Sequence, residues 1–595
     1  MSKPSIFEIF FGKDEQGSED NERAFFSREI TGSVSQRSKK ILSGSFFKFT
    51  KTASHLIAHI SSKIYGIALL SFGILGAMLY FLGISADGSV ANPIVGIVCA
   101  LLAVPLLLAD KPLPILLQDF KPTDYIFFEF FCMKRHSVSE GQSHFPVSAA
   151  IAIGCLPAML SSVLPFWQIA IIIGLIICVY IGMESPEFIF LISLFLLPYL
   201  RYIPYGEAAL NIAMALAMIS FARKVMYGRR VMYVEQYDIF IGAMLMLVLI
   251  SGIFVKGVES FSGSVRMIVL AMGYFLAGNL ITNRRLAELS ANAIITSGAF
   301  ASAISIAQFA STAISLGGSV TNTDLAYVLA RQDGVAVFLM AALIFAGGIG
   351  SQRGRRERPL YILSAVICAL GIIASGEMFI ATSLIVGLAA YAVIRSNKLP
   401  GLLVPLLLGL SLLMLLLPAG ILDFLFAYSP FIPSAEELFK LWQASMTAFA
   451  DNLFVGIGIG RESFVAEMAA LGIFGYSDSY NLFIELGLEA GMFALICFLM
   501  LLVTRVKHRS MQYLYVRSSQ IGLMSNLSGM CLFCLLAFGM VNYVWSDSSA
   551  YYLFWCIFGI GSATLRVAKR DYNDRVSYYK ETSAHDSSII DIEIG

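Results

Sequence analysis

The chain has 595 residues, of which 57% are hydrophobic and 14% are charged, whereas a soluble domain typically carries about 25% charged residues. No soluble core could bury that much apolar chain, so the composition excludes an ordinary soluble protein. The formal net charge of +1 gives no general attraction to a nucleic acid, and we expect no nucleic-acid partner.

Residues 1–62 form a polar segment in which Lys and Arg are interspersed with Phe and Ser. A segment of this composition buries too little apolar surface to fold alone, and its basic residues favour anionic lipid headgroups. We therefore expect a cytoplasmic, partly disordered polar arm that contacts membrane lipids.

Apolar stretches follow one another from residue 63 onward, and a helix of about 20 such residues can cross a membrane. They are centred near residues 75, 100, 155, 174, 195, 214, 247, 273, 304, 341, 366, 386, 408, 493, 533 and 558. The sequence therefore predicts an all-α polytopic membrane protein with about sixteen spans. Its expected parts are N-terminal membrane helices (63–182), core membrane helices (183–418), an extracytoplasmic loop (419–480), C-terminal membrane helices (481–567) and a cytoplasmic tail (568–595).

Basic residues are concentrated in alternate loops. The Lys/Arg-rich segments, which the positive-inside rule places in the cytoplasm, are 111–136, 223–230, 284–285, 353–358, 395–398, 505–517 and 566–575. The opposite loops contain few basic residues, namely Arg201, Lys256, Arg266, Arg331, Lys440 and Arg461. This alternation predicts a multi-pass protein of the bacterial inner membrane with both termini in the cytoplasm.

The extracytoplasmic loop is long enough to have structure of its own. Ser434, followed by Glu436, Glu437 and an apolar run, is typical of an N-capped amphipathic helix at the membrane interface. Three alternating glycines follow at 456–460, and such a turn lets the backbone approach a ligand or another chain closely.

Two segments carry a resemblance to a known family. Residues 441–464 read LWQASMTAFADNLFVGIGIGRESF, and residues 476–491 read YSDSYNLFIELGLEAG. They resemble the O-antigen ligase and Wzy-type polysaccharide polymerase superfamily. Its pattern is a Trp, an apolar helix, a G-x-G-x-G-like turn and a Phe, then a loop end bearing His and Asn, and an E-x-G in the next helix. The topology extends the resemblance to the C-terminal two thirds of the chain.

The resemblance implies a GT-C-like multi-helix bundle that acts outside the membrane on an undecaprenyl-diphosphate-linked oligosaccharide. The implied function is polymerisation of such repeats into a surface polysaccharide, and ligase-like transfer to another glycan acceptor is the nearest alternative. A transporter or flippase of lipid-linked glycans is the rival from a different class. It should show internal repeats and charges or broken helices near the bilayer midplane, whereas most charges here lie at predicted helix ends. We expect no cofactor and no metal.

Displacement at an anomeric carbon releases a lipid diphosphate, so the reaction needs fixed cations for the leaving group. Arginine suits this role because its guanidinium stays charged and binds phosphate oxygens in a bidentate manner. Arg266, near the predicted outer mouth of a span, is the first candidate, and contact with lipid headgroups is its alternative role. Arg331 is a second candidate, unless it pairs with Asp333 in water.

The residues expected to bind substrate are Arg461, Gly458, Gly460, Lys440, Arg201 and Asn481. Arg461 follows the glycine turn, and its alternative is a solvated loop residue. Arg201 is flanked by tyrosines that are also typical of an interfacial belt.

The general base is expected at 476–481, where family members commonly present a His and this chain has none. Asp478 is the carboxylate in that place, and its alternative role is to cap the next helix. Glu485 and Glu489 would be unfavourable facing lipid, so we expect them to face the protein interior. Asp547 is expected to cap the last helix unless it belongs to the site.

Two further positions depart from the family pattern. Ser375, Gly376 and Glu377 stand where the family often has Ser-Arg-Gly, and Leu438 stands where an Arg commonly precedes the Trp by one helical turn. The chain therefore has fewer cations than usual, which favours a divergent polymerase over a ligase.

Overall fold

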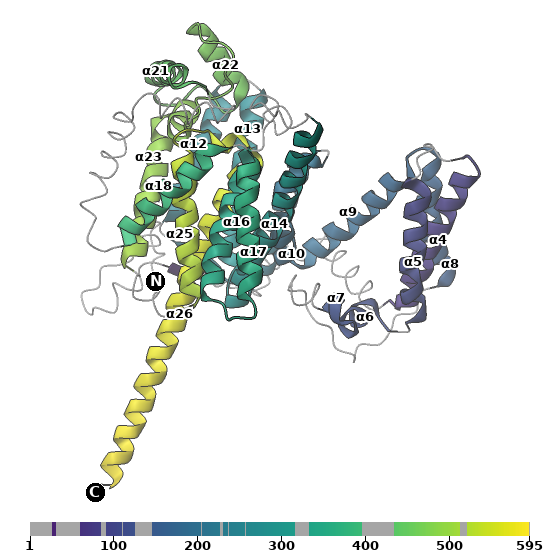
Figure 1. Ribbon diagram of the computed structural model, residues 1–595. Coiled ribbons are helices and arrows are strands. Elements are labelled where there is room, and N and C mark those ends of the chain that lie inside the picture. The colour runs from purple at the N-terminus through teal and green to yellow at the C-terminus, as the bar shows by residue number, and fades with distance from the viewer. Residues whose placement is uncertain are drawn as a thin grey trace, which may run out of the picture. The chain divides into compact units, whose positions relative to one another are not determined.

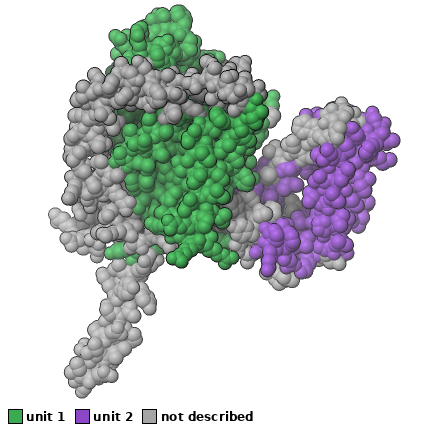
Figure 2. Space-filling model, in the orientation of Figure 1, with its two compact units in different colours: residues 1–30, 190–215, 231–595 green, residues 31–189, 216–230 purple. Residues whose placement is uncertain are grey.

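The computed structural model describes residues 27–30, 60–84, 91–109, 111–124, 146–203, 205–226, 230–235, 237–255, 258–315, 333–375, 377–395, 433–511 and 520–593. They fall into two compact units, coloured separately in Figure 2. Unit 1 comprises Met1–Ile30, Phe190–Ala215 and Val231–Gly595, and unit 2 comprises Thr31–Ile189 and Leu216–Arg230. The predicted boundary at residue 182 lies close to the end of the first segment of unit 2, and residues 216–230 group with that unit as well.

Unit 2 is built on apolar helices that pack through small residues. α4 (Ser62–Phe81) lies against α5 (Ala91–Leu108) and α8 (Val147–Met159). A Cβ atom on Gly73 would lie 2.6 Å from the carbonyl oxygen of Gly96, so glycine lets the two backbones approach closely. The remaining elements of unit 2 are α6 (Leu113–Asp119), α7 (Lys121–Thr123), η3 (Leu160–Ser162) and α9 (Phe166–Glu184). η4 (Leu197–Tyr202) belongs to unit 1, whereas α10 (Pro186–Leu196) and α11 (Gly206–Met226) each contain residues of both units.

Unit 1 contains most of the helices labelled in Figure 1. In chain order they are α12 (Tyr237–Phe254), α13 (Val258–Leu280), α14 (Arg284–Ser315), α16 (Asp333–Gln352), α17 (Arg358–Ala374), α18 (Met378–Arg395), α21 (Ala435–Asp451), α22 (Arg461–Ala470), α23 (Leu482–Met511), α25 (Gln520–Phe538), the short η5 (Val544–Ser546) and α26 (Ser548–Glu593). The predicted tail boundary at residue 567 falls inside α26.

The centre of unit 1 is the first half of α26. In its apolar segment 94% of the residues are buried, and α13 and α25 pack along it. Tyr552 and Trp555 are fully buried there. A Cβ atom on Gly273 would lie 2.5 Å from the Tyr552 ring, so a glycine on α13 makes room for this aromatic side chain.

The described helices agree with the predicted spans. Nine helices are long and apolar enough to cross a membrane, and six shorter apolar helices accompany them in the part of the chain that the structure describes. Every predicted centre falls in one of these helices, except the centre near residue 408, which lies outside the described residues. The architecture is that of an α-helical multi-pass membrane protein.

A small sheet was not predicted. β1 (Ser27–Ile30) pairs antiparallel with β2 (Met232–Glu235), with Ser27 opposite Glu235 and Ile30 opposite Met232. Four-residue segments are too short for the alternation of polar and apolar residues to identify a strand. The pairing ties part of the N-terminal arm to the helical core.

Loops predicted to share one side of the membrane meet at the same end of unit 1. Ile459 N donates to Ser260 Oγ at 2.9 Å, which joins two predicted outer segments. Arg570 Nη2 donates to Thr282 O at 3.0 Å, which joins two predicted inner segments. Which side of a membrane each end faces stays a prediction.

Candidate functional site

The amphipathic helix predicted after Ser434 is α21, and its predicted cap is confirmed. Ser434 and Glu437 form a capping box, in which Ser434 N donates to Glu437 Oε2 at 3.1 Å and Glu437 N donates to Ser434 Oγ. Trp442 Nε1 then donates to Ser479 O at 2.8 Å. This contact brings the two segments of the family resemblance together in space.

The glycine turn runs against two helices. Gly456, Gly458 and Gly460 have φ values of 78°, 97° and 120°, a backbone region that side chains disfavour. A Cβ atom on Gly456 would lie 2.4 Å from Glu489 O, and one on Gly458 would lie 2.7 Å from Ser260 Oγ. The close approach predicted for this turn is therefore made, at these two positions, to α23 and α13 of the same chain.

The turn fills a break in α23. Gly491 has φ 83° and ψ 170°, so the helix is interrupted there. Ile457 N donates to Leu488 O and Met492 N donates to Leu453 O, both at 2.8 Å. The loop thus makes hydrogen bonds that the interrupted helix loses, as an irregular backbone at membrane depth requires.

The break at Gly491 lies close to the middle of the candidate membrane span Leu482–Lys507. Basic residues begin at Arg505, so the apolar stretch after the break is too short to cross a bilayer by itself. A broken helix near the middle of a span is also a feature of transporters.

Two buried glutamates precede the break, and the expectation that they face the interior is confirmed. Glu489 is 3% exposed, and it accepts hydrogen bonds from Gly460 N at 3.0 Å and from Tyr543 OH at 2.6 Å. Glu485 is 1% exposed and accepts from Ser479 N at 2.7 Å. Burial, with the nearby negative charges, holds the pKa of Tyr543 well above its usual range, so this hydroxyl stays a donor.

Arg266 is a partly exposed cation on α13. Its side chain is 31% exposed, and its Nη1 is 3.9 Å from Glu207 Oε2. It also interacts electrostatically with Glu259, Glu489 and Tyr543. The first predicted cation therefore interacts electrostatically, without an ion pair among the described residues, with a buried carboxylate that the sequence had not assigned to the site. We call Arg266, Glu259, Glu489, Tyr543 and the 456–460 turn the glycine-turn cluster.

Asp478 holds a tight turn at the end of its loop. Its carboxylate accepts from Ser477 Oγ at 3.1 Å and from the backbone N of Tyr480 at 3.0 Å, and Tyr480 has a φ of 52°. Asn481 caps α23 instead, because its Oδ1 accepts from Phe483 N at 3.0 Å. The role of Asp478 as a base stays a prediction, as does substrate binding by Asn481.

The other predicted site residues lie apart from the cluster or outside the described side chains. Lys440 is exposed and pairs with Glu436 at 2.7 Å, and each partner stabilises the charged form of the other, which raises the pKa of Lys440 and lowers that of Glu436. Arg461 is the exposed first residue of α22. Arg201 belongs to η4, but its side chain is outside the described part, and Arg331 is wholly outside it.

Asp547 caps α26, as expected. Its Oδ1 accepts from Ser549 N at 2.7 Å and from Ala550 N at 3.0 Å. The contact between Glu489 and Tyr543 was not predicted from the sequence. A glutamate and a glycine within an apolar run, at Glu489-Ala490-Gly491, could have identified Glu489 as a site residue. No comparable pattern in the sequence surrounds Tyr543.

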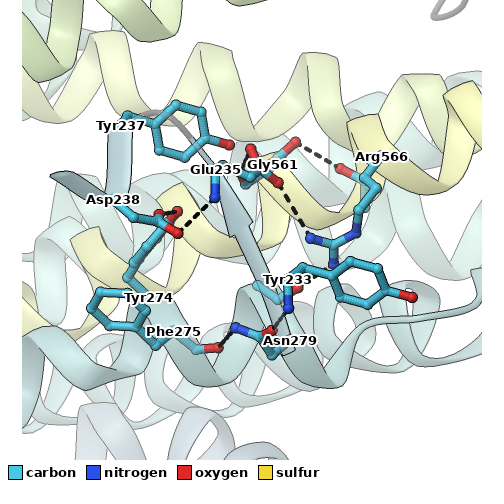
Figure 3. A network of polar contacts seen from close by, with 12 residues as sticks. Tyr233, Glu235, Tyr237, Asp238, Tyr274, Phe275, Asn279, Gly561 and Arg566 are labelled. Carbon is cyan, nitrogen blue, oxygen red and sulfur yellow. Dashed lines mark hydrogen bonds and ion pairs between the residues drawn. The ribbon is translucent and has the colours of Figure 1, made fainter. Parts of the chain in front are cut away.

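A second buried polar group, which we call the Glu235 network, lies where β2, α12, α13 and α26 meet (Figure 3). Arg566 Nη1 is 3.3 Å from Glu235 Oε1, and Ser562 Oγ donates to Glu235 Oε2 at 3.0 Å. Glu235 N donates to Asp238 Oδ2 at 2.8 Å, and the Tyr274 hydroxyl donates to Asp238 Oδ1. Carboxylates and a cation therefore neutralise one another within the protein.

Aromatic rings pack against the arginines at the Glu235 network. Arg566 stacks over Tyr233 at 3.9 Å from the ring centroid, and Arg505 lies 5.2 Å from the Phe558 centroid. Burial raises the pKa of Glu235 to about 7, although the nearby Arg566 favours the charged carboxylate.

Comparison with known proteins adds no relative: no family model matches the chain, and no curated protein matches it significantly. The case for a function therefore depends on the geometry of the two buried polar groups and on the motif residues themselves.

Proposed function

We propose that this chain is a membrane glycosyltransferase that polymerises undecaprenyl-diphosphate-linked oligosaccharide repeats into a surface polysaccharide. The observation that supports this best is the glycine turn, in which Gly460 N holds the buried carboxylate of Glu489, with the partly exposed cation Arg266 close enough to interact with it electrostatically. Transfer of the glycan to a different acceptor is the same chemistry with another nucleophile.

The cluster offers the groups that this reaction needs. An acceptor hydroxyl oxygen bonds to the anomeric carbon, the bond from that carbon to the diphosphate oxygen breaks, and the hydroxyl proton passes to a base. Arg266 can bind the departing diphosphate in a bidentate manner, and its partial exposure leaves it open to such a ligand. No described group of His, Cys, Asp and Glu side chains could hold a metal ion, and we propose that charge stabilisation comes from arginine.

One observation favours a second candidate, a transporter of lipid-linked glycans. α23 is broken at Gly491 and carries two buried glutamates, and broken helices with buried charges occur at transporter sites. The structured segment that carries α21, the glycine turn and α22 beside α23 favours chemistry at that face, and therefore the enzyme.

Chain extension by the purified protein separates the two candidates. The protein is reconstituted in vesicles with a lipid-diphosphate-linked oligosaccharide, and the products are resolved by size. A glycosyltransferase yields a ladder of longer glycans and free lipid diphosphate. A transporter moves the donor to the other leaflet and leaves it covalently unchanged, which would contradict the proposal.

The proposed topology is tested separately by cysteine labelling in a variant without the nine native cysteines. If both termini are cytoplasmic and the 419–480 segment is outside, a membrane-impermeant reagent added outside labels cysteines placed at Ser434 and Ser477 but not at Ser396, which lies outside the described residues. Labelling of the Ser396 position alone would invert the topology.

A further inference from the structure

Glu489 connects the elements of the glycine-turn cluster through hydrogen bonds. Its carboxylate accepts from Gly460 N and from Tyr543 OH, and its own carbonyl oxygen accepts from Ser251 Oγ at 2.6 Å and from Gly458 N at 3.2 Å. Side chain and backbone together therefore join α23, α12, the turn and the segment before η5.

Hydrogen bonds that only connect these elements do not require an ionisable side chain at position 489. The two donors that hold the carboxylate are an amide N–H and a phenol, and a neutral amide side chain could accept from the first and bond to the second. Among the described residues, no Lys or Arg forms an ion pair with Glu489, whereas Glu235 has Arg566. A buried ionisable group without such a partner is unfavourable, and in membrane proteins it marks function by default.

The carboxylate lies just beneath a partly open surface. Gly460, which donates to Glu489 Oε1, is only half-buried, and a Cβ atom placed on it would meet no atom closer than 3.5 Å, in Glu259. Arg266 interacts electrostatically with Glu489 and is itself partly exposed. A sugar hydroxyl that binds beside Gly460 would therefore come close to the Glu489 carboxylate, on which the charge of Arg266 also acts.

We infer that Glu489 is the general base of the proposed transferase and that Tyr543 is its positioning residue; the inference rests on the proposed function. As the acceptor oxygen bonds to the anomeric carbon, its proton passes to the Glu489 carboxylate. The electron pair of the broken carbon–oxygen bond leaves with the diphosphate, which Arg266 holds. The proton is then lost to water and the carboxylate is restored. Asp478, which holds the turn at Tyr480, has a structural role.

The main test compares the neutralising substitutions Glu489→Gln, Asp478→Asn and Glu467→Gln in the chain-extension assay. Glu489→Gln keeps the acceptor for Gly460 N and removes the base, so we expect turnover to fall by roughly 10²–10⁴-fold, as for other lost general bases. Binding of the lipid-linked donor should change by less than about twofold, because Arg266 is retained. Glu467→Gln, on α22 outside the cluster, is the matched control and should match the parent.

Chemical rescue separates a base from a structural residue. Glu489→Ala leaves space for a small carboxylate, so added formate should restore part of its turnover, and formate should not affect Glu467→Gln. Tyr543→Phe removes the hydroxyl that orients the carboxylate and should lower kcat by about tenfold while KM stays near the parent value.

The outcomes distinguish the two hypotheses. Full turnover by Glu489→Gln in an active parent would overturn the base assignment and leave the proposed transferase intact. Loss of turnover in Asp478→Asn with full turnover in Glu489→Gln would transfer the role to Asp478. If the parent itself extends no glycan, both the function and the base assignment fail.

Discussion

The glycine-turn cluster and the Glu235 network are two buried polar groups joined by the same helices. α12, α13 and α23 each contribute to both, and along α12 the distance from Asp238 to Ser251 is roughly 20 Å at 1.5 Å per residue. In the Glu235 network, carboxylates meet arginines under aromatic rings. In the glycine-turn cluster, neutral donors hold the carboxylate and the cation is partly exposed.

This difference separates stabilisation from ligand binding. A charge that is already paired and covered has no reason to bind anything else, and removing its partner leaves an uncompensated buried charge. A cation that is only partly covered can still exchange water for a ligand. We therefore expect substitutions in the Glu235 network to change stability, and substitutions in the glycine-turn cluster to change turnover.

The largest effect is expected from Arg566→Ala. The substitution leaves the buried Glu235 carboxylate without its ion-pair partner and should lower the free energy of unfolding by about 3–5 kcal/mol. Denaturant unfolding of the purified protein measures this loss. Arg570→Ala, which removes a more exposed arginine on the same helix, is the control and should cost less than about 1 kcal/mol. Equal stability of the two variants would refute the structural role of the network.

Arg266→Ala should act in the opposite way, with normal folding and lost activity. Removal of a fixed charge at a developing anion typically lowers turnover by about 10²–10³-fold. Arg266→Lys should recover only part of it, because an ammonium keeps the charge but not the bidentate geometry. Arg356→Ala removes an exposed positive charge elsewhere and serves as the control. A fully active Arg266→Ala protein would reduce this residue to a lipid anchor.

Much of the helical architecture could be predicted from the sequence, because an apolar stretch of membrane-spanning length leaves the chain few other structures. Local capping was equally readable: Ser434 and Asp547 cap the helices that follow them. The inward orientation of Glu485 and Glu489 followed from the penalty of exposing a carboxylate to lipid.

What could not be predicted depends on contacts between distant parts of the chain. The hydrogen bond from Tyr543 to Glu489 joins residues 54 positions apart, and neither residue has a periodicity that reveals the other. The break at Gly491 is made by the loop that enters it, so the glycine alone does not identify it. The same holds for β1, whose partner lies some two hundred residues later.

The pH dependence of stability tests whether Glu235 is as buried as its network suggests. Its pKa is about 7 in the folded protein and about 4.3 in an unfolded chain. Between these values the folded state keeps a proton that the unfolded state has lost. The contribution of Glu235 to stability is therefore present below about pH 4 and is lost as the pH rises through 7, by about 4 kcal/mol in total.

The measurement is the free energy of unfolding of the parent and of Glu235→Gln at pH 5 and pH 8. The parent should lose more stability than the variant between these values, and the difference between the two isolates Glu235 from the other titrating groups. If both lose the same amount, the carboxylate titrates as in water and the network does not shield it.

The smallest effect is expected at the cap of α21, which packs with Ile457 of the glycine turn through Leu441 and Ala448. Ser434→Ala removes the acceptor for Glu437 N, and loss of such a cap costs about 1 kcal/mol, or roughly a fivefold faster amide exchange in the first turn. Ser434→Asp is the control, since Asp caps a helix as well as Ser does. The exposed Ser434 contributes nothing to the ion pairs of the Glu235 network, so exchange near β2 should be unchanged. If exchange near β2 rises together with that of α21, the two polar groups are coupled through the three shared helices. The separation of stability from turnover would then have to be abandoned.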